Sequence, residues 1–125
     1  MANDELDVLG QFLMKHLRDR GISKVEGLLT GHWKAPGLKR LQRDLGALTP
    51  EQQDLVRRAV ISSLDTALHA FLFAVQEQTD LDGPIAITVR GENVARMSDG
   101  LQGELVTEDG WFARFSASGE PPEDE

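Results

Sequence analysis

The chain has no cysteine among its 125 residues. Disulfide bonds, thiolate metal sites and a cysteine nucleophile are therefore excluded. The absence fits a reducing compartment, and we expect a cytoplasmic protein.

A leader and a long apolar run are also lacking. The opening residues, MANDELDVLGQFL, contain no basic segment followed by an unbroken apolar stretch, so we expect no signal peptide. The most apolar run covers residues 67–75, which is too short to span a bilayer, and it contains His69. These features predict a soluble protein that does not contact a membrane.

The sequence contains none of the motifs that carry common chemistries. It has no G-x-S-x-G nucleophile elbow, no P-loop and no G-x-G-x-x-G after a predicted strand. The segment 80–83, DLDG, resembles the start of a calcium loop but lacks the later acidic ligands. We expect no cofactor and no metal, and the missing motifs favour a protein that is not an enzyme.

Basic residues are few, 13 against 21 acidic ones, and the net charge is −8. The formal charge is −1 over residues 1–33, +3 over 34–58 and −10 over 59–125. The acidic half would repel nucleic acid and attract basic proteins. The basic cluster could contact a phosphate, although a solvated helix face is its simpler interpretation; it consists of Lys34, Lys39, Arg40, Arg43, Arg57 and Arg58.

Helical signals fill the first third of the chain. Leucines at positions 6, 9, 13 and 17 follow helical spacing, with an N-cap at Asn3 or Asp4 and a predicted left-handed stop at Gly21. Residues 23–26, SKVE, match a capping box and predict a short second helix that Gly31 ends.

Two further helices are predicted before residue 80. Pro36 suits a first helical position, and Gly46 would end that helix. Residues 49–52, TPEQ, combine an N-cap, a first-turn proline and a glutamine at the third position. They predict a helix to about Gln78 whose second half, LHAFLFAV, is apolar nearly all round and should therefore be the central, mostly buried element.

The hydrophobic period changes from helix-like to strand-like after residue 84. Alternation predicts strands over 85–90, 94–97, 104–106 and 111–115, joined by tight turns. Helices followed by strands predict an α+β fold with a C-terminal antiparallel meander of three to four strands.

The length and the hydrophobic content of 40% suit one domain. We place this domain at residues 1–116. The acidic, proline-containing segment 117–125 is predicted to be a disordered tail.

Charged residues beside aromatic ones suggest a protein-binding surface on the predicted sheet and on the loop around Trp33. Core packing of both indoles is the alternative interpretation. The candidate binding residues are Trp33, Arg90, Glu92, Arg96, Asp99, Glu104, Glu108, Asp109 and Trp111.

A second hypothesis places a small-ligand or minor enzymatic site between the helices and the sheet. Asp65 and His69 are four residues apart and share a helix face, which is half of a general-base arrangement, and His32 could join them. A structural pair of Asp65 and His69 is the simpler alternative, because no nucleophile accompanies them.

The absence of a catalytic set and the acidic character favour a non-enzymatic protein-binding module of the immunity, antitoxin or adaptor kind, with a basic protein as the expected partner. Self-association is a third possibility. If the short helices and small sheet leave part of the apolar helix uncovered, a homodimer would form through it.

Overall fold

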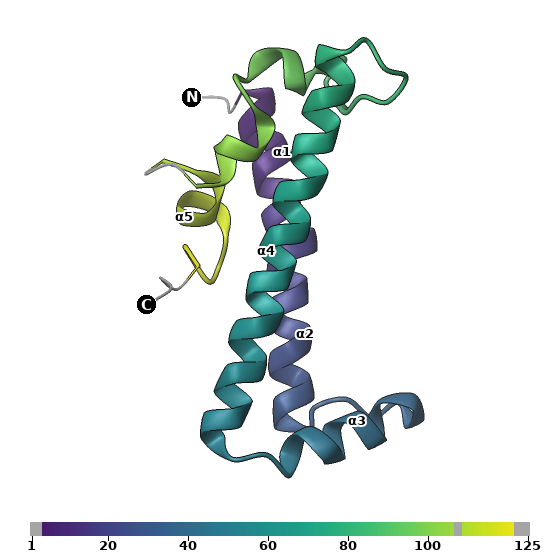
Figure 1. The fold of residues 1–125 in the computed structure, drawn as a ribbon, viewed down its shortest axis with the longest axis vertical. Helices are drawn as coiled ribbons and strands as arrows, with labels where there is room; N and C mark the ends of the chain where they lie inside the picture. Colours follow the sequence, from purple (N-terminus) through teal and green to yellow (C-terminus); the bar gives the residue numbers. More distant parts are fainter. Residues whose placement is uncertain (1–3, 107–108, 122–125) are drawn as a thin grey trace.

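A computed structural model describes residues 4–106 and 109–121. Two long helices lie side by side and run in opposite directions, and a shorter helix, α3, projects from one end of the pair (Figure 1). The C-terminal segment packs along the other half of the pair. The architecture is therefore mostly helical.

The first long helix is continuous from Glu5 to Thr30. It consists of α1 (Glu5–Leu13), one turn of π-helix, η1 (Met14–Arg18), and α2 (Asp19–Thr30). The cap at Asp4 is confirmed, because its Oδ1 accepts from the Asp7 amide at 2.8 Å. The stop predicted at Gly31 is also confirmed, by a left-handed φ of 72°.

The stop predicted at Gly21 is wrong, and so is the new helix start at residues 23–26, because α2 passes through both. A Cβ atom added at Gly21 would lie 2.6 Å from Cδ2 of Leu64. The glycine therefore allows α2 to approach the opposite helix closely.

The other two predicted helices are present. Helix α3 (Pro36–Gly46) begins at its proline, and α4 (Pro50–Asp80) begins with the capping box of Thr49 and Gln52. The Gln42 side chain bonds both the amide and the carbonyl of Trp33 at 2.8 Å, which fastens α3 to the end of α2.

The C-terminal third differs most from the prediction. Its sheet has only two short antiparallel strands, β1 (Thr88–Val89) and β2 (Glu92–Asn93), among the described residues. Arg90 and Gly91 form the turn between them, both with positive φ, as a two-residue hairpin requires.

Helical turns replace the other predicted strands. They are η2 (Val94–Met97), η3 (Leu101–Leu105) and α5 (Trp111–Phe115). The strands predicted over 94–97, 104–106 and 111–115 are therefore wrong, and the meander of three to four strands is not confirmed among the described residues. A helix suits Trp111 and Phe112 because both are buried, whereas a strand would point one of them outward.

The main core lies where the C-terminal segment covers the two helices. Gln76 of α4 is buried there, with its amide nitrogen 3.0 Å from the Ala95 carbonyl and its oxygen 2.9 Å from the Leu101 amide. The core side chains come from both long helices and every C-terminal turn: Leu9, Met14, Leu68, Leu72, Val75, Val94, Ala95, Leu101, Leu105, Trp111 and Phe112.

Part of the segment predicted to be a disordered tail makes specific contacts. The Ala117 amide donates to both carboxylate oxygens of Asp19, and the Gly119 carbonyl accepts from Arg18 at 2.6 Å. Residues 122–125 lie outside the described part of the chain, so the disorder of the tail stays a prediction there.

Candidate functional site

The solvent-facing side of α4 is a long surface with few charges. Between Arg58 and Glu77 the helix has one formal charge, Asp65. An 18-residue window of α4 reaches a mean hydropathy of 1.4, yet only 22% of that window is buried. We call this surface the α4 face; it contains Val60, Ser63, Ala67, Ala70, Phe71 and Ala74.

Aromatic side chains make this face apolar. Phe71 is 50% exposed and Phe73 is 48% exposed. At 3.6 residues per turn, these two side chains fall on opposite sides of the row formed by Ala67, Ala70 and Ala74. Aromatic rings that are half in water are typical of surfaces that bind other proteins.

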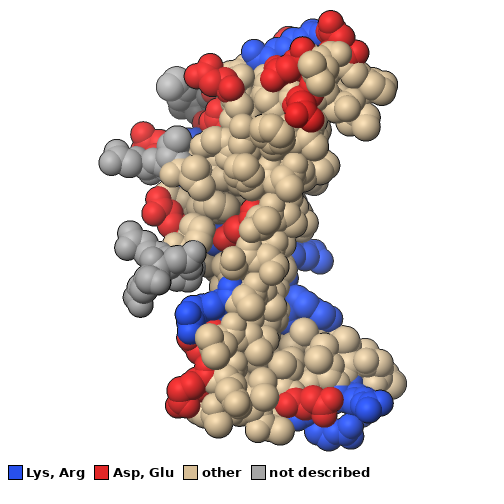
Figure 2. Space-filling view, in the orientation of Figure 1, with Lys and Arg blue, Asp and Glu red and all other residues tan. Residues whose placement is uncertain are grey.

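Charged side chains are dense at the two ends of the molecule, whereas uncharged surface covers most of the middle of the visible face, with a few acidic and basic side chains among it (Figure 2). The acidic end, residues 4–14 and 74–106, holds nine acidic and two basic residues, a net charge of −7. The basic end, residues 20–58, holds eight basic and four acidic residues, a net charge of +4. The molecule is therefore electrically polar along its long axis.

An ion pair at the basic end joins the two long helices. Arg57 of α4 bonds Glu26 of α2 and also reaches Asp54 within α4. The hydrogen bond to Glu26 raises the pKa of Arg57 above its ordinary value, and the guanidinium stays charged. The positive charge of Arg57 is thus fixed in place.

The two predicted aromatic anchors differ in burial. Trp111 is fully buried, and a Cβ added at Gly10 would lie 2.5 Å from its Nε1. Trp33 is half-buried and lies equally close to Gly27, with the Lys24 ammonium 4.6 Å from the indole centroid. Trp111 therefore packs in the core, whereas Trp33 keeps part of its surface in solvent.

The other predicted binding residues are scattered over the acidic end and the C-terminal segment. Arg90 pairs with Glu5 at 3.4 Å, and Glu104 accepts from the Ser98 hydroxyl at 2.7 Å. Glu108 lies outside the described residues. The remaining predicted residues are exposed: Glu92, Arg96, Asp99 and Asp109.

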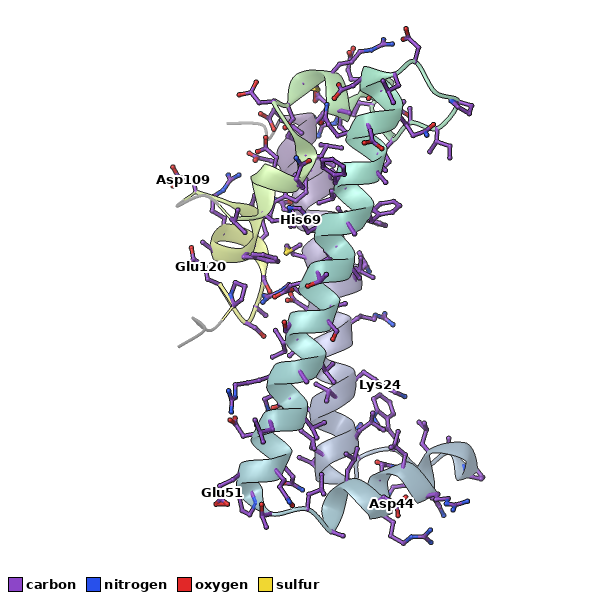
Figure 3. All side chains as sticks on the ribbon, in the orientation of Figure 1. Lys24, Asp44, Glu51, His69, Asp109 and Glu120 are labelled. Carbon is purple, nitrogen blue, oxygen red and sulfur yellow. The ribbon has the colours of Figure 1, made fainter. Side chains whose placement is uncertain are left out.

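The structure does not bring Asp65, His69 and His32 together. His69 is exposed midway along α4 (Figure 3), whereas His32 follows α2 at the basic end, where it packs edge-on against Trp33. Asp65 bonds Arg18 instead of a histidine, through Oδ1 at 2.7 Å and Oδ2 at 3.1 Å. The half general-base arrangement is thus not assembled.

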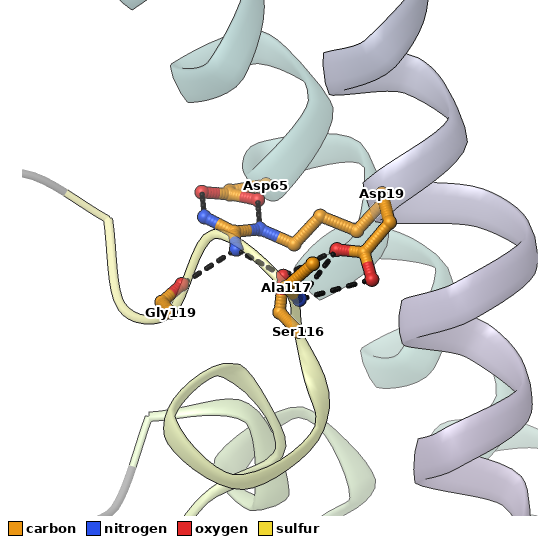
Figure 4. Close-up of polar contacts among 6 residues, drawn as sticks. Asp19, Asp65, Ser116, Ala117 and Gly119 are labelled. Carbon is orange, nitrogen blue, oxygen red and sulfur yellow. Dashed lines mark hydrogen bonds and ion pairs between the residues drawn. The ribbon is translucent and has the colours of Figure 1, made fainter.

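Arg18 is the central polar residue that the sequence did not indicate. Its side chain is 1% exposed and bonds Asp65, the Ser116 hydroxyl and the Gly119 carbonyl (Figure 4). Its guanidinium also lies 4.4 Å from the Phe112 ring centroid. Arg18 therefore ties the π-turn, α4 and the C-terminal segment together, and its contacts are structural.

The described part of the chain offers no metal centre. No group of three histidine, aspartate or glutamate side chains there could hold a metal ion. A shallow concavity at the start of α4 is lined by Pro50, Glu51, Asp54, Leu55 and Arg58, and it includes no histidine.

By length and composition alone, α4 could cross a membrane. Buried helices of soluble proteins meet the same criterion, so this is weak evidence by itself.

No known protein family, curated protein or solved structure matches this chain.

Proposed function

We propose that the protein is a non-enzymatic protein-binding module that contacts its partner through the α4 face. The observation that carries the proposal is a long, uncharged helix surface that remains in solvent. Contiguous exposed apolar surface is costly to a soluble protein and usually marks an interaction site.

The shape of this surface supports a protein partner over a small ligand. Small molecules bind in concave sites that enclose most of their surface, and the α4 face is the outer side of a single helix. The acid–base pair that an enzymatic site would need is also separated, since Asp65 bonds Arg18.

A protein partner in water also suits this helix better than a lipid bilayer does. Asp65 lies near the middle of α4 and pairs with Arg18. The helix packed beside α4 carries charged residues within three turns of that pair, among them Lys15, Asp19 and Lys24. Placing them in hydrocarbon would cost several kcal/mol each, at about 2.5–3.5 kcal/mol per residue.

The charge separation favours a partner that carries positive charge on one side. Such a partner would be attracted to the acidic end, residues 4–14 and 74–106, while its apolar surface covered the α4 face. The same complementarity would serve a cytoplasmic role of the immunity or adaptor kind, in which an acidic surface holds a basic one.

The test is affinity capture at low salt with three immobilised chains: wild type, Ala70→Glu and Ser62→Glu. Ala70 lies within the α4 face, whereas Ser62 is an exposed residue of the same helix outside it. We expect the wild type and Ser62→Glu to retain the same protein, whether another chain or added copies of this one, and Ala70→Glu to lose it. Equal retention by all three chains, or none, would contradict the proposal.

A further inference from the structure

We infer that the partner of the α4 face is a second copy of this chain, packed antiparallel to the first in a symmetric dimer. The inference rests on the proposed function and adds the identity and the orientation of the partner. Its evidence is the surface area, the residue spacing along α4 and the distribution of charge.

The chain exposes more surface than a compact monomer of its size. Its accessible area is 8225 Å², against about 6,600 Å² expected for a compact 13.8 kDa protein. The excess of about 1,600 Å² is roughly twice the 800 Å² that each partner buries in a standard interface. Over two chains it amounts to about 3,200 Å², which falls in the range of obligate homodimers.

The half of the molecule at the basic end has few buried side chains. There α2 packs against α4 and α3 packs against α2, and the buried side chains are Ile22, Val25 and Leu29, with Gln42. A second copy laid on the α4 face would pack a second long helix against the side of α4 that faces away from α2.

The spacing of residues on the α4 face suits such packing. Alternate steps of four and three residues lead along one stripe of the helix, which is the pattern of a coiled-coil seam. The stripe passes through Val56, Val60, Ser63, Ala67, Ala70, Ala74, Glu77 and Leu81. Small side chains at its centre allow two helix axes to approach closely, while Phe71 and Phe73 can close over the sides.

The middle of this seam carries no charge, and the charged residue within the stripe, Glu77, lies toward one end. Asp65 points to the opposite side of α4, where it bonds Arg18. His69 falls more than 100° away from the stripe at 3.6 residues per turn. An interface centred between Ala67 and Ala70 would therefore bury no unpaired charge at its middle.

The separation of charge selects the antiparallel orientation. In a parallel dimer the two acidic ends, each −7, would lie together. In the antiparallel dimer each acidic end lies beside the partner copy's basic end, which is +4. The two-fold axis then passes between Ala67 and Ala70, so that Val60 faces Glu77 and Val56 faces Leu81 of the other copy.

The first measurement is sedimentation equilibrium of the wild type, Ala70→Glu and Ser62→Glu from 1 to 200 µM. We expect the wild type and Ser62→Glu to have twice the 13.8 kDa chain mass. Ala70→Glu should raise the dissociation constant at least 100-fold, because two carboxylates would be buried beside the two-fold axis. Unchanged far-UV circular dichroism shows that Ala70→Glu is folded.

The orientation is tested by disulfide formation, for which the absence of native cysteine is convenient. Val60→Cys chains mixed with Glu77→Cys chains should form a mixed disulfide across the antiparallel seam. Val60→Cys alone should not form a disulfide with itself. Efficient self-coupling of Val60→Cys would overturn the antiparallel arrangement.

A wild type that stays monomeric throughout the range would overturn the dimer. Two further experiments then test whether the α4 face still binds a protein. Capture of another protein that Ala70→Glu loses would leave the binding module intact with a different partner. Flotation of the monomer with phosphatidylcholine vesicles, again lost in Ala70→Glu, would assign the α4 face to lipid and contradict both proposals.

Discussion

Removing the carboxylate of Asp65 should destabilise the fold more than any other single change on α4 outside the apolar core. Arg18 is 1% exposed, and Asp65 supplies both oxygens that neutralise it. Asp65→Ala leaves a buried guanidinium without a counter-ion, which typically costs about 3–5 kcal/mol. Because Ser116 and Gly119 still accept from Arg18, we expect the lower part of that range, about 3 kcal/mol.

The assay is urea unfolding followed by circular dichroism, with all variants at one protein concentration because dimerisation adds to stability. His69→Ala is the matched control: it lies one turn away on the same helix, is exposed, and should stay within about 0.5 kcal/mol of the wild type. Replacing both ionic partners, by Arg18→Met with Asp65→Leu, should recover much of the loss, because no charge remains buried. A cost below about 1 kcal/mol for Asp65→Ala, or an equal cost for His69→Ala, would refute the reasoning.

Three further changes test the local contacts. Gly10→Ala should cost about 1–3 kcal/mol and shift the Trp111 emission to longer wavelength, because the added methyl group would displace the indole; unchanged emission and stability would contradict the close contact. Thr49→Ala removes the N-cap of α4 and should cost about 1 kcal/mol in thermal unfolding, whereas Thr49→Ser should cost less. Ser116→Ala removes a hydroxyl that accepts from Arg18, and should cost about 1 kcal/mol and speed amide exchange at residues 117–119; unaltered exchange would show that the segment is held by other contacts.

The features that sequence reasoning predicted correctly depend on neighbouring residues. The caps at Asp4 and Thr49 are satisfied by amides three residues ahead, and the left-handed stop at Gly31 depends on one backbone torsion. Such signals depend on residues within about one helical turn of each other. The bounds of α3 and α4 therefore follow from the sequence, and so does the mostly helical first part of the fold.

Where the prediction failed, a distant residue decides the conformation. Gly21 resembles a helix stop, but Leu64 of α4 occupies the space that a side chain at that position would need. The segment 111–115 alternates like a strand, but the core between α1 and η3 takes both Trp111 and Phe112, which only a helical turn can deliver. Short segments of mixed polarity carry no local signal strong enough to resist such packing.

In the candidate site, too, the features that depend on neighbouring residues were predicted and those that depend on distant residues were not. The apolar character of 67–75 was visible in the sequence, and so was the possibility that the other elements would leave it uncovered. The sequence did not reveal that Asp65 pairs with Arg18. His69 is only four residues from Asp65 on the same helix, whereas Arg18 is 47 residues away in the chain. Arg18 lies at the end of the π-turn, where it contacts Asp65 of α4.

The proposal that the α4 face is covered is consistent with both the composition and the fold. A hydrophobic content of 40% suits a protein with a full core, yet the continuous core occupies only the half of the helix pair that the C-terminal segment covers. On the outer side of α4, apolar side chains outside this core remain in solvent: Phe71 is 50% and Phe73 48% exposed, and the exposed Ala67, Ala70 and Ala74 lie between them. Residues distributed in this way are what a helix buried on both sides requires. The second copy would supply the missing side, which is why the sequence of α4 resembles a central helix although a single chain leaves much of it in solvent.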